Sequence, residues 1–156
     1  MMKTEENKSW KTVSEIDLVY RTKVKNSERP HITSSRYAYS LIKDCWDPGK
    51  IEFLEQFKVL LLNQSNKVLG IYEASSGGIT GTVVDIRLLF AAALKAGAVG
   101  LIITHNHPSG SLLPSNPDRY ITAKIAQAGE LLDIKLLDHL IITEESYYSF
   151  ADEGAL

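Results

Sequence analysis

Apolar residues recur along this chain with two different periods, and the change of period separates predicted helices from predicted strands. A helical period, with apolar side chains three and four positions apart, runs over residues 33–46, 85–97 and 116–132. Ser and Thr residues offer N-caps for the first stretch, and Gly97 ends the second. The sequence therefore predicts three amphipathic helices.

Shorter apolar stretches predict β-strands, at residues 15–20, 55–62, 68–72, 98–104, 135–143 and 147–150. The second and third of these flank a polar turn and predict a hairpin. The fourth is almost wholly apolar, as expected for a strand buried on both faces. Strands interleaved with helices around one hydrophobic sheet predict an α/β fold, in which a mixed β-sheet is packed with helices on both sides.

The length of the chain fits one domain. Its 156 residues can bury a hydrophobic core without disulfides or a structural metal, and 44% of them are hydrophobic. Residues 1–14 are polar and unpatterned, so we expect a disordered terminus followed by a single domain over residues 15–156. The sequence contains no repeat, low-complexity tract or linker that would divide this range.

The charge and the hydropathy of the sequence limit which partners and which cellular location we expect. The formal net charge is −2 with both signs interspersed, so the basic face of a dedicated duplex-DNA binder is not visible in the sequence. The longest apolar run, residues 96–104, is about half as long as a membrane span. The first dozen residues lack the apolar centre of a secretory signal. We therefore expect a cytoplasmic protein without a membrane segment, and the charge does not support nucleic-acid binding.

Cys45 is the only cysteine in the sequence, which excludes an internal disulfide and a zinc site built from several thiolates. It also excludes the zinc deaminases, because these enzymes need a Pro-Cys-x-x-Cys pair. Cys45 falls on the apolar side of the first predicted helix, beside Trp46. We therefore expect a small buried side chain there and not a nucleophile.

Two histidines follow the apolar strand, where a buried sheet would meet solvent. In an extended chain His105 and His107 point to the same side, about 6.6 Å apart along the strand. Both imidazoles can then bind one zinc ion at about 2.1 Å, and Asp118, in the first turn of the third predicted helix, can supply an anionic third ligand. These ligands leave a fourth position for water, as in catalytic zinc sites. We therefore expect one zinc ion per chain.

Ser115 and Asp118 also have a purely structural interpretation. Ser115-x-x-Asp118 ahead of an amphipathic helix has the pattern of a capping box, and Pro117 suits the first helical turn. A residue in the Asp118 position can cap weakly or bind a metal, but we do not expect it to do both well. Taken alone, the residues leave both interpretations open.

The stretch from His105 to Asp118 matches His-x-His-Pro-x6-Ser-x2-Asp at every fixed position, and it resembles the JAMM (JAB/MPN-type) metallopeptidase family. The His-Asn-His-Pro-Ser-Gly run, the segment at residues 136–139 and the loop at residues 77–82 look like its bacterial RadC-like branch. This resemblance covers about residue 55 to the C-terminus and implies a cytidine-deaminase-like sandwich. It also implies a zinc-dependent peptidase or isopeptidase that acts on a peptide or protein. Longer RadC-like proteins carry a helix-hairpin-helix region ahead of this domain, and we expect none here.

The resemblance also implies roles for two further residues. Glu55 matches the glutamate that serves this family as general acid and base, and Ser115 matches the serine that donates a hydrogen bond to the oxyanion. Glu52 and Glu73 are the rival carboxylates. Glu55 is favoured because an extended strand places it on the same side as the apolar residues Phe57, Val59 and Leu61.

His139 and Asp138 are the remaining residues for which the sequence suggests a role. We expect His139 to be a core histidine with its hydrogen bonds satisfied, and not a metal ligand. Asp138 either orients an imidazole or lies at the surface, and the sequence leaves this open.

The alternatives to a metallohydrolase are a binding module that holds a metal without turnover and an accessory protein of DNA repair. The sequence does not indicate the substrate or the oligomeric state.

Overall fold

The core of the molecule is a mixed β-sheet, in which the described residues form five strands in the order β2-β1-β3-β4-β5. The computed structural model describes residues 12–78 and 83–156. β3 and β4 run parallel, and the other neighbouring strands are antiparallel. The strands are β1 (Gln56–Leu62), β2 (Val68–Ser76), β3 (Gly100–Asn106), β4 (Lys135–Ile142) and β5 (Tyr147–Ser149).

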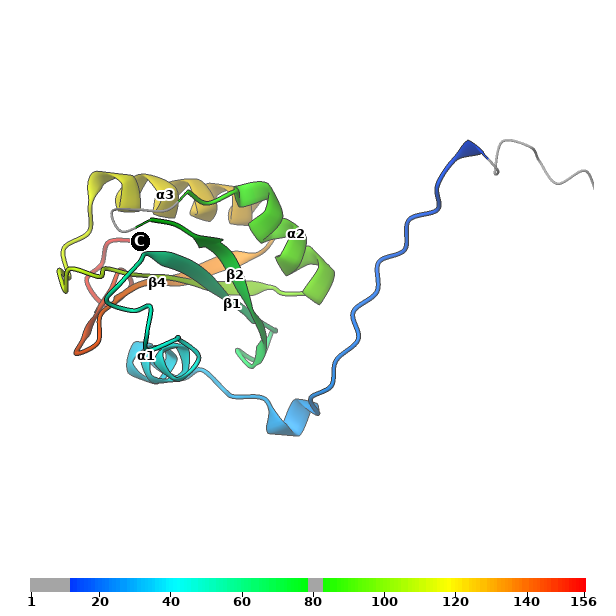
Figure 1. Ribbon diagram of the computed structural model, residues 1–156. Helices are drawn as coiled ribbons and strands as arrows, with labels where there is room; N and C mark the ends of the chain where they lie inside the picture. Colours follow the sequence, from blue (N-terminus) through cyan, green and yellow to red (C-terminus); the bar gives the residue numbers. More distant parts are fainter. Residues whose placement is uncertain (1–11, 79–82) are drawn as a thin grey trace, which may run out of the picture.

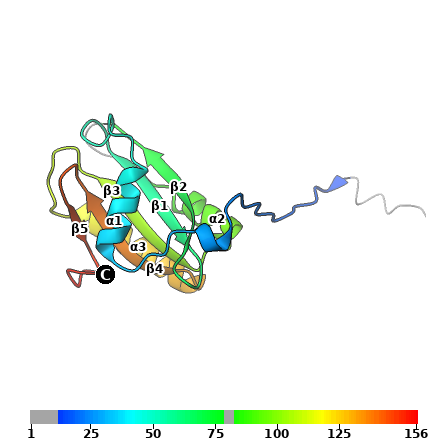
Figure 2. The same ribbon diagram turned by 90° about the horizontal axis from the view of Figure 1, so that it is seen from below.

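Helices cover both faces of this sheet. α2 (Ile86–Ala96) and α3 (Asn116–Leu131) lie on one face, and α1 (Ser35–Asp44) lies on the other (Figure 1). Figure 2 shows the molecule from below, with α1 crossing in front of the strands. The predicted α/β fold, with helices on both sides of a mixed sheet, is confirmed. Within the described part of the chain, no helix is long and apolar enough to cross a membrane.

The element boundaries follow from caps and burial that the sequence encodes. All residues of β3 are buried, because α1 covers one of its faces and α2 and α3 cover the other. α1 begins after Ser34, whose hydroxyl oxygen accepts a hydrogen bond from the Tyr37 amide. α2 ends at Gly97, which has a φ of 69°, a left-handed conformation that glycine adopts without strain. The three predicted helices therefore begin and end within one or two residues of their expected positions.

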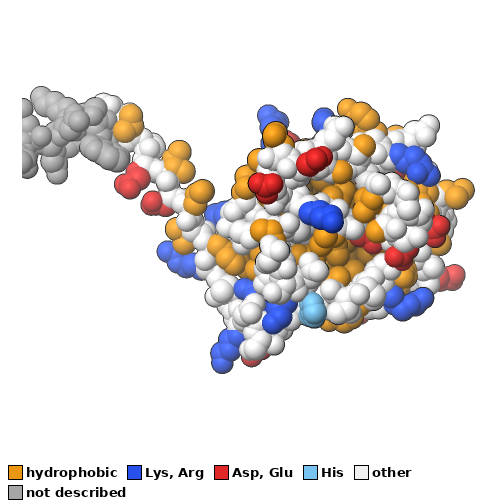
Figure 3. Space-filling view, turned by 180° about the vertical axis from the view of Figure 1, so that it is seen from behind, with side chains coloured by type: hydrophobic (Ala, Val, Ile, Leu, Met, Phe, Trp, Pro, Cys, Tyr) orange, Lys and Arg blue, Asp and Glu red, His pale blue; other side chains and the backbone are white. Residues whose placement is uncertain are grey.

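The predicted strand at residues 15–20 is wrong. This segment is extended but pairs with no strand of the described sheet, and it leads away from the body with its apolar side chains exposed (Figure 3). Ile16 and Leu18 are 84% and 86% exposed, although the Tyr20 hydroxyl donates to the Leu69 carbonyl at 2.9 Å. Alternation predicts the faces of a strand but cannot supply its partner. The predicted disordered terminus, residues 1–14, falls mostly outside the described residues.

The burial predicted for Cys45 is also wrong, because its side chain is exposed. Cys45 is the C-cap of α1, its backbone is helical and its amide donates to the Leu41 carbonyl at 3.2 Å, so the helical phase is kept. Trp46, the next residue, is buried in the α1-side core. Trp46 therefore continues the buried stripe at this end of the helix, and Cys45 lies at the exposed margin of that stripe.

Candidate metal centre

β3 carries the two histidines to the edge of the sheet. His105 is buried and lies opposite Phe57 of β1. His107 follows the strand, but its amide still donates to the Ile142 carbonyl of β4 at 3.1 Å, so the chain stays paired through this residue. The two imidazoles therefore point to the same side of the sheet, the side covered by α2 and α3, as the spacing predicts.

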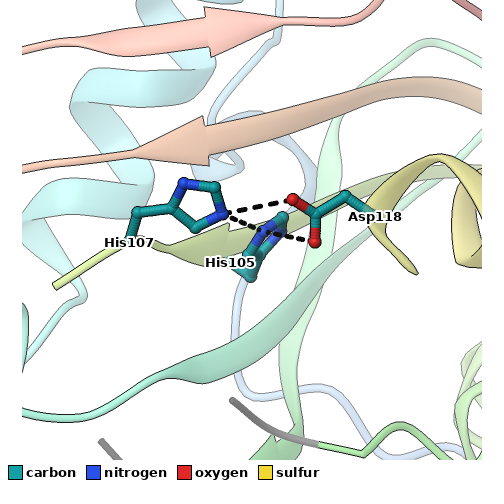
Figure 4. Close-up of side chains that lie close together, drawn as sticks. All are labelled: His105, His107 and Asp118. Carbon is teal, nitrogen blue, oxygen red and sulfur yellow. Dashed lines mark hydrogen bonds and ion pairs between the residues drawn. The ribbon is translucent and has the colours of Figure 1, made fainter. Parts of the chain in front are cut away.

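Asp118 at the start of α3 completes a three-residue cluster. One ligand atom from each of His105, His107 and Asp118 lies within 4.8 Å of the others. The His105 Nε2 atom is 3.1 Å from Asp118 Oδ1, and the His107 Nε2 atom is 3.2 Å from Asp118 Oδ2. The two Nε2 atoms are 2.9 Å apart. Figure 4 shows all three side chains converging on one point.

This donor set fits a zinc ion. In a tetrahedral site with bonds of about 2.1 Å, ligand atoms lie roughly 3.4 Å from one another, close to the separations found here. Two imidazoles and a carboxylate are also the donor types that zinc binds in catalytic sites. A cation would separate nitrogen and oxygen lone pairs that otherwise face one another. The three predicted ligands are therefore brought together, and the cluster can hold a metal.

The capping-box interpretation of Ser115 and Asp118 holds as well. The Ser115 Oγ atom accepts from the Asp118 amide at 3.1 Å, and Asp118 Oδ2 accepts from the Ser115 amide at 2.8 Å. The cap occupies Oδ2 and leaves Oδ1 directed at His105. The two interpretations are therefore compatible, because the cap fixes the carboxylate in the orientation that a metal ligand needs.

The electrostatics of the cluster favour an ionised carboxylate. Burial alone would raise the pKa of Asp118, but hydrogen bonds with His105 and His107 outweigh it and hold this pKa well below its ordinary range. Burial would likewise lower the pKa of His107, but the Asp118 carboxylate and the Ser111 carbonyl outweigh it and raise this pKa. The ionised form of Asp118 is therefore favoured beside the two imidazoles.

His139 and Thr122 form a hydrogen-bond chain behind His105. The His139 Nε2 atom is 2.8 Å from His105 Nδ1, and His139 Nδ1 is 2.6 Å from Thr122 Oγ1. The Thr122 hydroxyl donates to the Asp118 carbonyl at 2.7 Å. If His105 binds a metal through Nε2, its Nδ1–H must donate to His139, whose own Nδ1–H then donates to Thr122. The chain therefore fixes the tautomer of His105 that suits metal binding.

Glu55 lies one residue ahead of β1 and lines the same cavity as the three clustered residues. Its carbonyl accepts from the Gly77 amide at 2.8 Å. Burial raises the pKa of Glu55 despite the opposing effect of the two histidines. Of its rivals, Glu52 is exposed away from this cavity, and Glu73 accepts a hydrogen bond from the Gln56 side chain on the α1 face. Of these three glutamates, Glu55 is the one that lines the cavity together with the cluster.

Comparison with known proteins places this site in a family. The model of the RadC-like JAB domain matches residues 32–155, most of the chain. The chain belongs to the RadC-like JAB domain family. The matched range begins ahead of residue 55, where we expected the resemblance to start, so α1 is part of the RadC-like domain. This correction has a physical basis, since α1 covers one face of the sheet.

Relatives of this RadC-like domain occur in longer bacterial proteins. A UPF0758 protein from Flavobacterium johnsoniae is 55% identical over 123 residues, which cover 79% of this chain and 52% of the relative. A UPF0758 protein from Porphyromonas gingivalis is 42% identical over 130 residues, covering 82% and 56%. The chain thus spans about half the length of the curated relatives it matches.

An open cavity of ≈ 1230 Å³ runs over the candidate site of the RadC-like domain. Its floor is formed by the metal cluster with Glu55 and Ser115. One wall is the segment that leads into α2 together with the start of that helix, including Val84 and Ile86, and the other is the exposed side of α3 with Tyr120. Of the predicted loop at residues 77–82, the structure describes Gly77 and Gly78, and residues 79–82 lie outside the described residues. The cavity is therefore open and largely apolar beside a polar floor.

Several residues around the site have hydrogen-bond partners that the sequence did not predict. His139 is a fully buried histidine outside the cluster, as predicted, but its partner is a candidate ligand. Asp138 matches neither expectation, because it is buried and accepts from the Ser149 hydroxyl at 2.6 Å. Thr122 was missed, although its position four residues after Asp118 puts both on one helix face.

Proposed function

We propose that this domain is a zinc metallohydrolase that cleaves a peptide or isopeptide amide bond with a metal-activated water. The observation that carries the proposal is the convergence of His105, His107 and Asp118 on one point at the floor of a cavity that Glu55 also lines. A zinc ion at this point would lower the pKa of a coordinated water to about 7 and polarise a substrate carbonyl.

The ligands would be held by the protein before the metal arrives. His107 has its Nδ1 atom 2.8 Å from the Ser111 carbonyl, which requires a proton on Nδ1 and leaves Nε2 free as a donor to zinc. His105 is oriented in the same sense by His139. Because both rings and the capped carboxylate are already fixed, little conformational entropy is lost on metal binding.

Glu55 is proposed as the general base and acid. It would take a proton from the attacking water and deliver it to the amine that leaves when the amide carbon–nitrogen bond breaks. Burial raises the pKa of this carboxyl, which makes the ionised form a stronger base than an exposed glutamate. The charges of His105 and His107 oppose this rise and favour the ionised form, which is the form that can act as a base.

Ser115 is proposed to stabilise the oxyanion that forms on the substrate carbonyl. As the N-cap of α3, its Oγ atom uses a lone pair to accept from the Asp118 amide. The hydroxyl hydrogen is not consumed by this cap and can be donated into the cavity that Ser115 lines. Removing one donor of this kind typically costs on the order of 10²–10³ in rate.

The shape of the site supports a peptide or protein substrate. An open cavity of ≈ 1230 Å³ exceeds what a small ligand fills, and its apolar walls suit side chains on either side of a scissile bond. The formal net charge of −2 offers no general attraction for nucleic acid. We propose a cytoplasmic location, because the sequence has a single cysteine and no apolar run as long as a membrane span.

The test is hydrolysis of a mixed peptide and isopeptide library by zinc-loaded protein and by Glu55→Gln. The variant keeps the shape of the side chain and removes the base, so we expect it to bind zinc and melt like the wild type while activity falls by roughly 10²–10⁴. Equal activity of the two proteins would overturn the role of Glu55. Zinc binding without cleavage of any library member by the wild type would favour a metal-holding binding module instead.

A further inference from the structure

We propose that Asn106, the residue between the two histidines, is a positioning residue that fixes Glu55 relative to the metal ligands. This inference rests on the proposed function, in which Glu55 acts on a water at the metal. It concerns a side chain that faces away from the cavity and contacts neither the ligands' ring nitrogens nor the substrate.

The alternation of β3 separates Asn106 from its neighbours. His105 and His107 point toward α2 and α3, so the side chain of Asn106 points to the opposite face, where it is 0% exposed. A buried carboxamide has two N–H donors and an acceptor oxygen that must all be satisfied without water. The groups that satisfy this carboxamide on that face therefore show which part of the chain Asn106 holds in place.

All of these hydrogen bonds go to the segment that carries Glu55. The Asn106 Nδ2 atom donates to the carbonyls of Ile51 and Leu54, both at 2.8 Å. The Asn106 Oδ1 atom accepts from the amide of Gln56 at 2.7 Å. Leu54 and Gln56 are the residues on either side of Glu55, so one side chain holds the backbone both before and after the proposed base.

The sheet holds Glu55 on the β2 side, where its amide donates to the Gly78 carbonyl at 3.3 Å and its carbonyl accepts from the Gly77 amide at 2.8 Å, but main-chain pairing does not link this segment to β3. Main-chain pairing between β1 and β3 ends at Phe57 and His105, one step short of Gln56 and Asn106. At that step the Asn106 side chain takes the place of a main-chain acceptor for the Gln56 amide. The preceding residues, 47–54, form turns and bends, which without such a clamp would have more freedom than the strand.

The consequence for chemistry follows from distance. A general base must stay within hydrogen-bond reach of the water it deprotonates, and a misplacement of about 1 Å can cost roughly 10²-fold in rate. Because Asn106 belongs to the same strand as the ligands, any movement of β3 carries the base segment with it. The base and the metal ligands are thereby held as one unit, although Glu55 precedes β1 and His105 lies on β3.

The first test needs no substrate. Asn106→Asp keeps the shape and the acceptor for Gln56 but places a carboxylate against two carbonyl oxygens, and Asn106→Ala removes all three bonds without adding charge. We expect hydrogen exchange of the Gln56 amide to accelerate at least about tenfold in both variants, because its acceptor is displaced or lost. Unchanged protection of Gln56 in the alanine variant would overturn the proposal.

Asn63→Ala is the matched control. The Asn63 side chain also holds a turn, accepting from the amides of Ser65 and Lys67 at 3.0 Å, but that turn lies at the far end of β1. We expect faster exchange at its own turn and no change at Gln56. Faster exchange at Gln56 in this control would show general loosening and would overturn the specific role of Asn106.

The second test separates positioning from stability. In the wild-type background we expect the Asn106 variants to lower kcat by roughly 10–10²-fold, with zinc affinity within about threefold of wild type. In the Glu55→Gln background the same substitutions should have almost no further effect, because the group they position is gone. Equal losses in both backgrounds would mean a structural role only and would overturn the proposal.

The two tests also separate this inference from the proposed function. If zinc-loaded wild type cleaves nothing, the proposed function fails. Hydrogen exchange of the Gln56 amide and the zinc affinities of the Asn106 variants then still decide whether Asn106 anchors residues 51–56 to β3. If the wild type is active but Gln56 exchange does not respond to Asn106→Ala, the positioning proposal fails alone.

Discussion

Two buried carboxylates on the same domain, Asp118 and Asp138, show how similar residues come to serve different purposes. Asp138 lies within β4 and accepts hydrogen bonds from the Ser149 hydroxyl at the end of β5 and from the Ala151 amide, at 2.6 and 3.0 Å. Its partners are ordinary donors, so its hydrogen bonds are complete without any ligand. Asp118 instead faces the Nε2 atoms of two histidines.

The electrostatics of the two regions differ accordingly. Burial raises the pKa of Asp138, and the surrounding hydrogen bonds only partly oppose it. The pKa of Asp118 is held well below its ordinary range, because hydrogen bonds with the two histidines outweigh its burial. A neutral imidazole offers Nε2 as a lone pair, so carboxylate and imidazoles together favour a cation. The lesson is that the partners of a buried acid, more than its burial, distinguish structural from chemical use.

The largest effect that tests this contrast is expected for Asp118→Asn. The change discards the anionic ligand and keeps the size of the side chain, so we expect zinc affinity to fall by more than about 10²-fold. Competition with a chromophoric chelator measures the loss. An affinity within a few-fold of wild type would mean that Asp118 serves only as a cap.

Thr122→Val should have an intermediate effect. Valine has the shape of threonine but cannot accept from His139 Nδ1, so the tautomer of His105 is no longer fixed. We expect zinc affinity to weaken by about tenfold, the usual cost of losing a partner behind a ligand. Thr143→Val is the control, because its hydroxyl donates to the Ser146 carbonyl in the β4–β5 turn and should affect stability only.

Asp138→Asn should leave zinc affinity unchanged and cost about 1 kcal/mol in the free energy of unfolding. The Ser149 hydroxyl can turn round and donate elsewhere or accept from the new amide, so only part of the hydrogen bonding is lost. Chemical denaturation and zinc titration of the same sample measure both quantities. A large loss of zinc affinity here would erase the contrast between the two carboxylates.

The smallest expected effect is a pH dependence of the metal-free protein. The pKa of His107 is raised above its ordinary value, 6.5, so its contribution to stability is complete below that pH and is lost as the pH rises through the folded-state pKa. Zinc competes with the proton for Nε2, so zinc affinity should increase over the same range. Thermal melts from pH 6 to about 8.5 should show a widening gap between zinc-loaded and metal-free protein. A constant gap would contradict the role of His107 as a ligand.

The convergence of the three candidate ligands and most of the fold could be predicted because they depend on local spacing. His105 and His107 are separated by one residue on a strand, and Ser115 and Asp118 by one helical turn, so the sequence determines their relative directions. The helices follow from apolar periodicity and from caps such as Ser34 and Gly97. These features require no knowledge of which distant segments meet.

The features that could not be predicted depend on contacts between distant segments. Asn106 meets Ile51 across 55 residues, and His139 meets His105 across 34. Residues 15–20 alternate like a strand, but a strand also needs a free edge beside it, which no local pattern specifies. Asp138 was misjudged for the same reason, because its partner Ser149 is contributed by the next strand.

Metal analysis of wild-type protein purified without chelators tests the central claim most directly. We predict one zinc ion per chain, bound through His105, His107 and Asp118, and loss of that zinc in Asp118→Asn but not in Asp138→Asn. The variants share the same chemical change at buried carboxylates, so general misfolding does not explain a difference between them. Failure of wild-type protein to bind zinc even when it is supplied in excess, or equal zinc in both variants, would contradict the account.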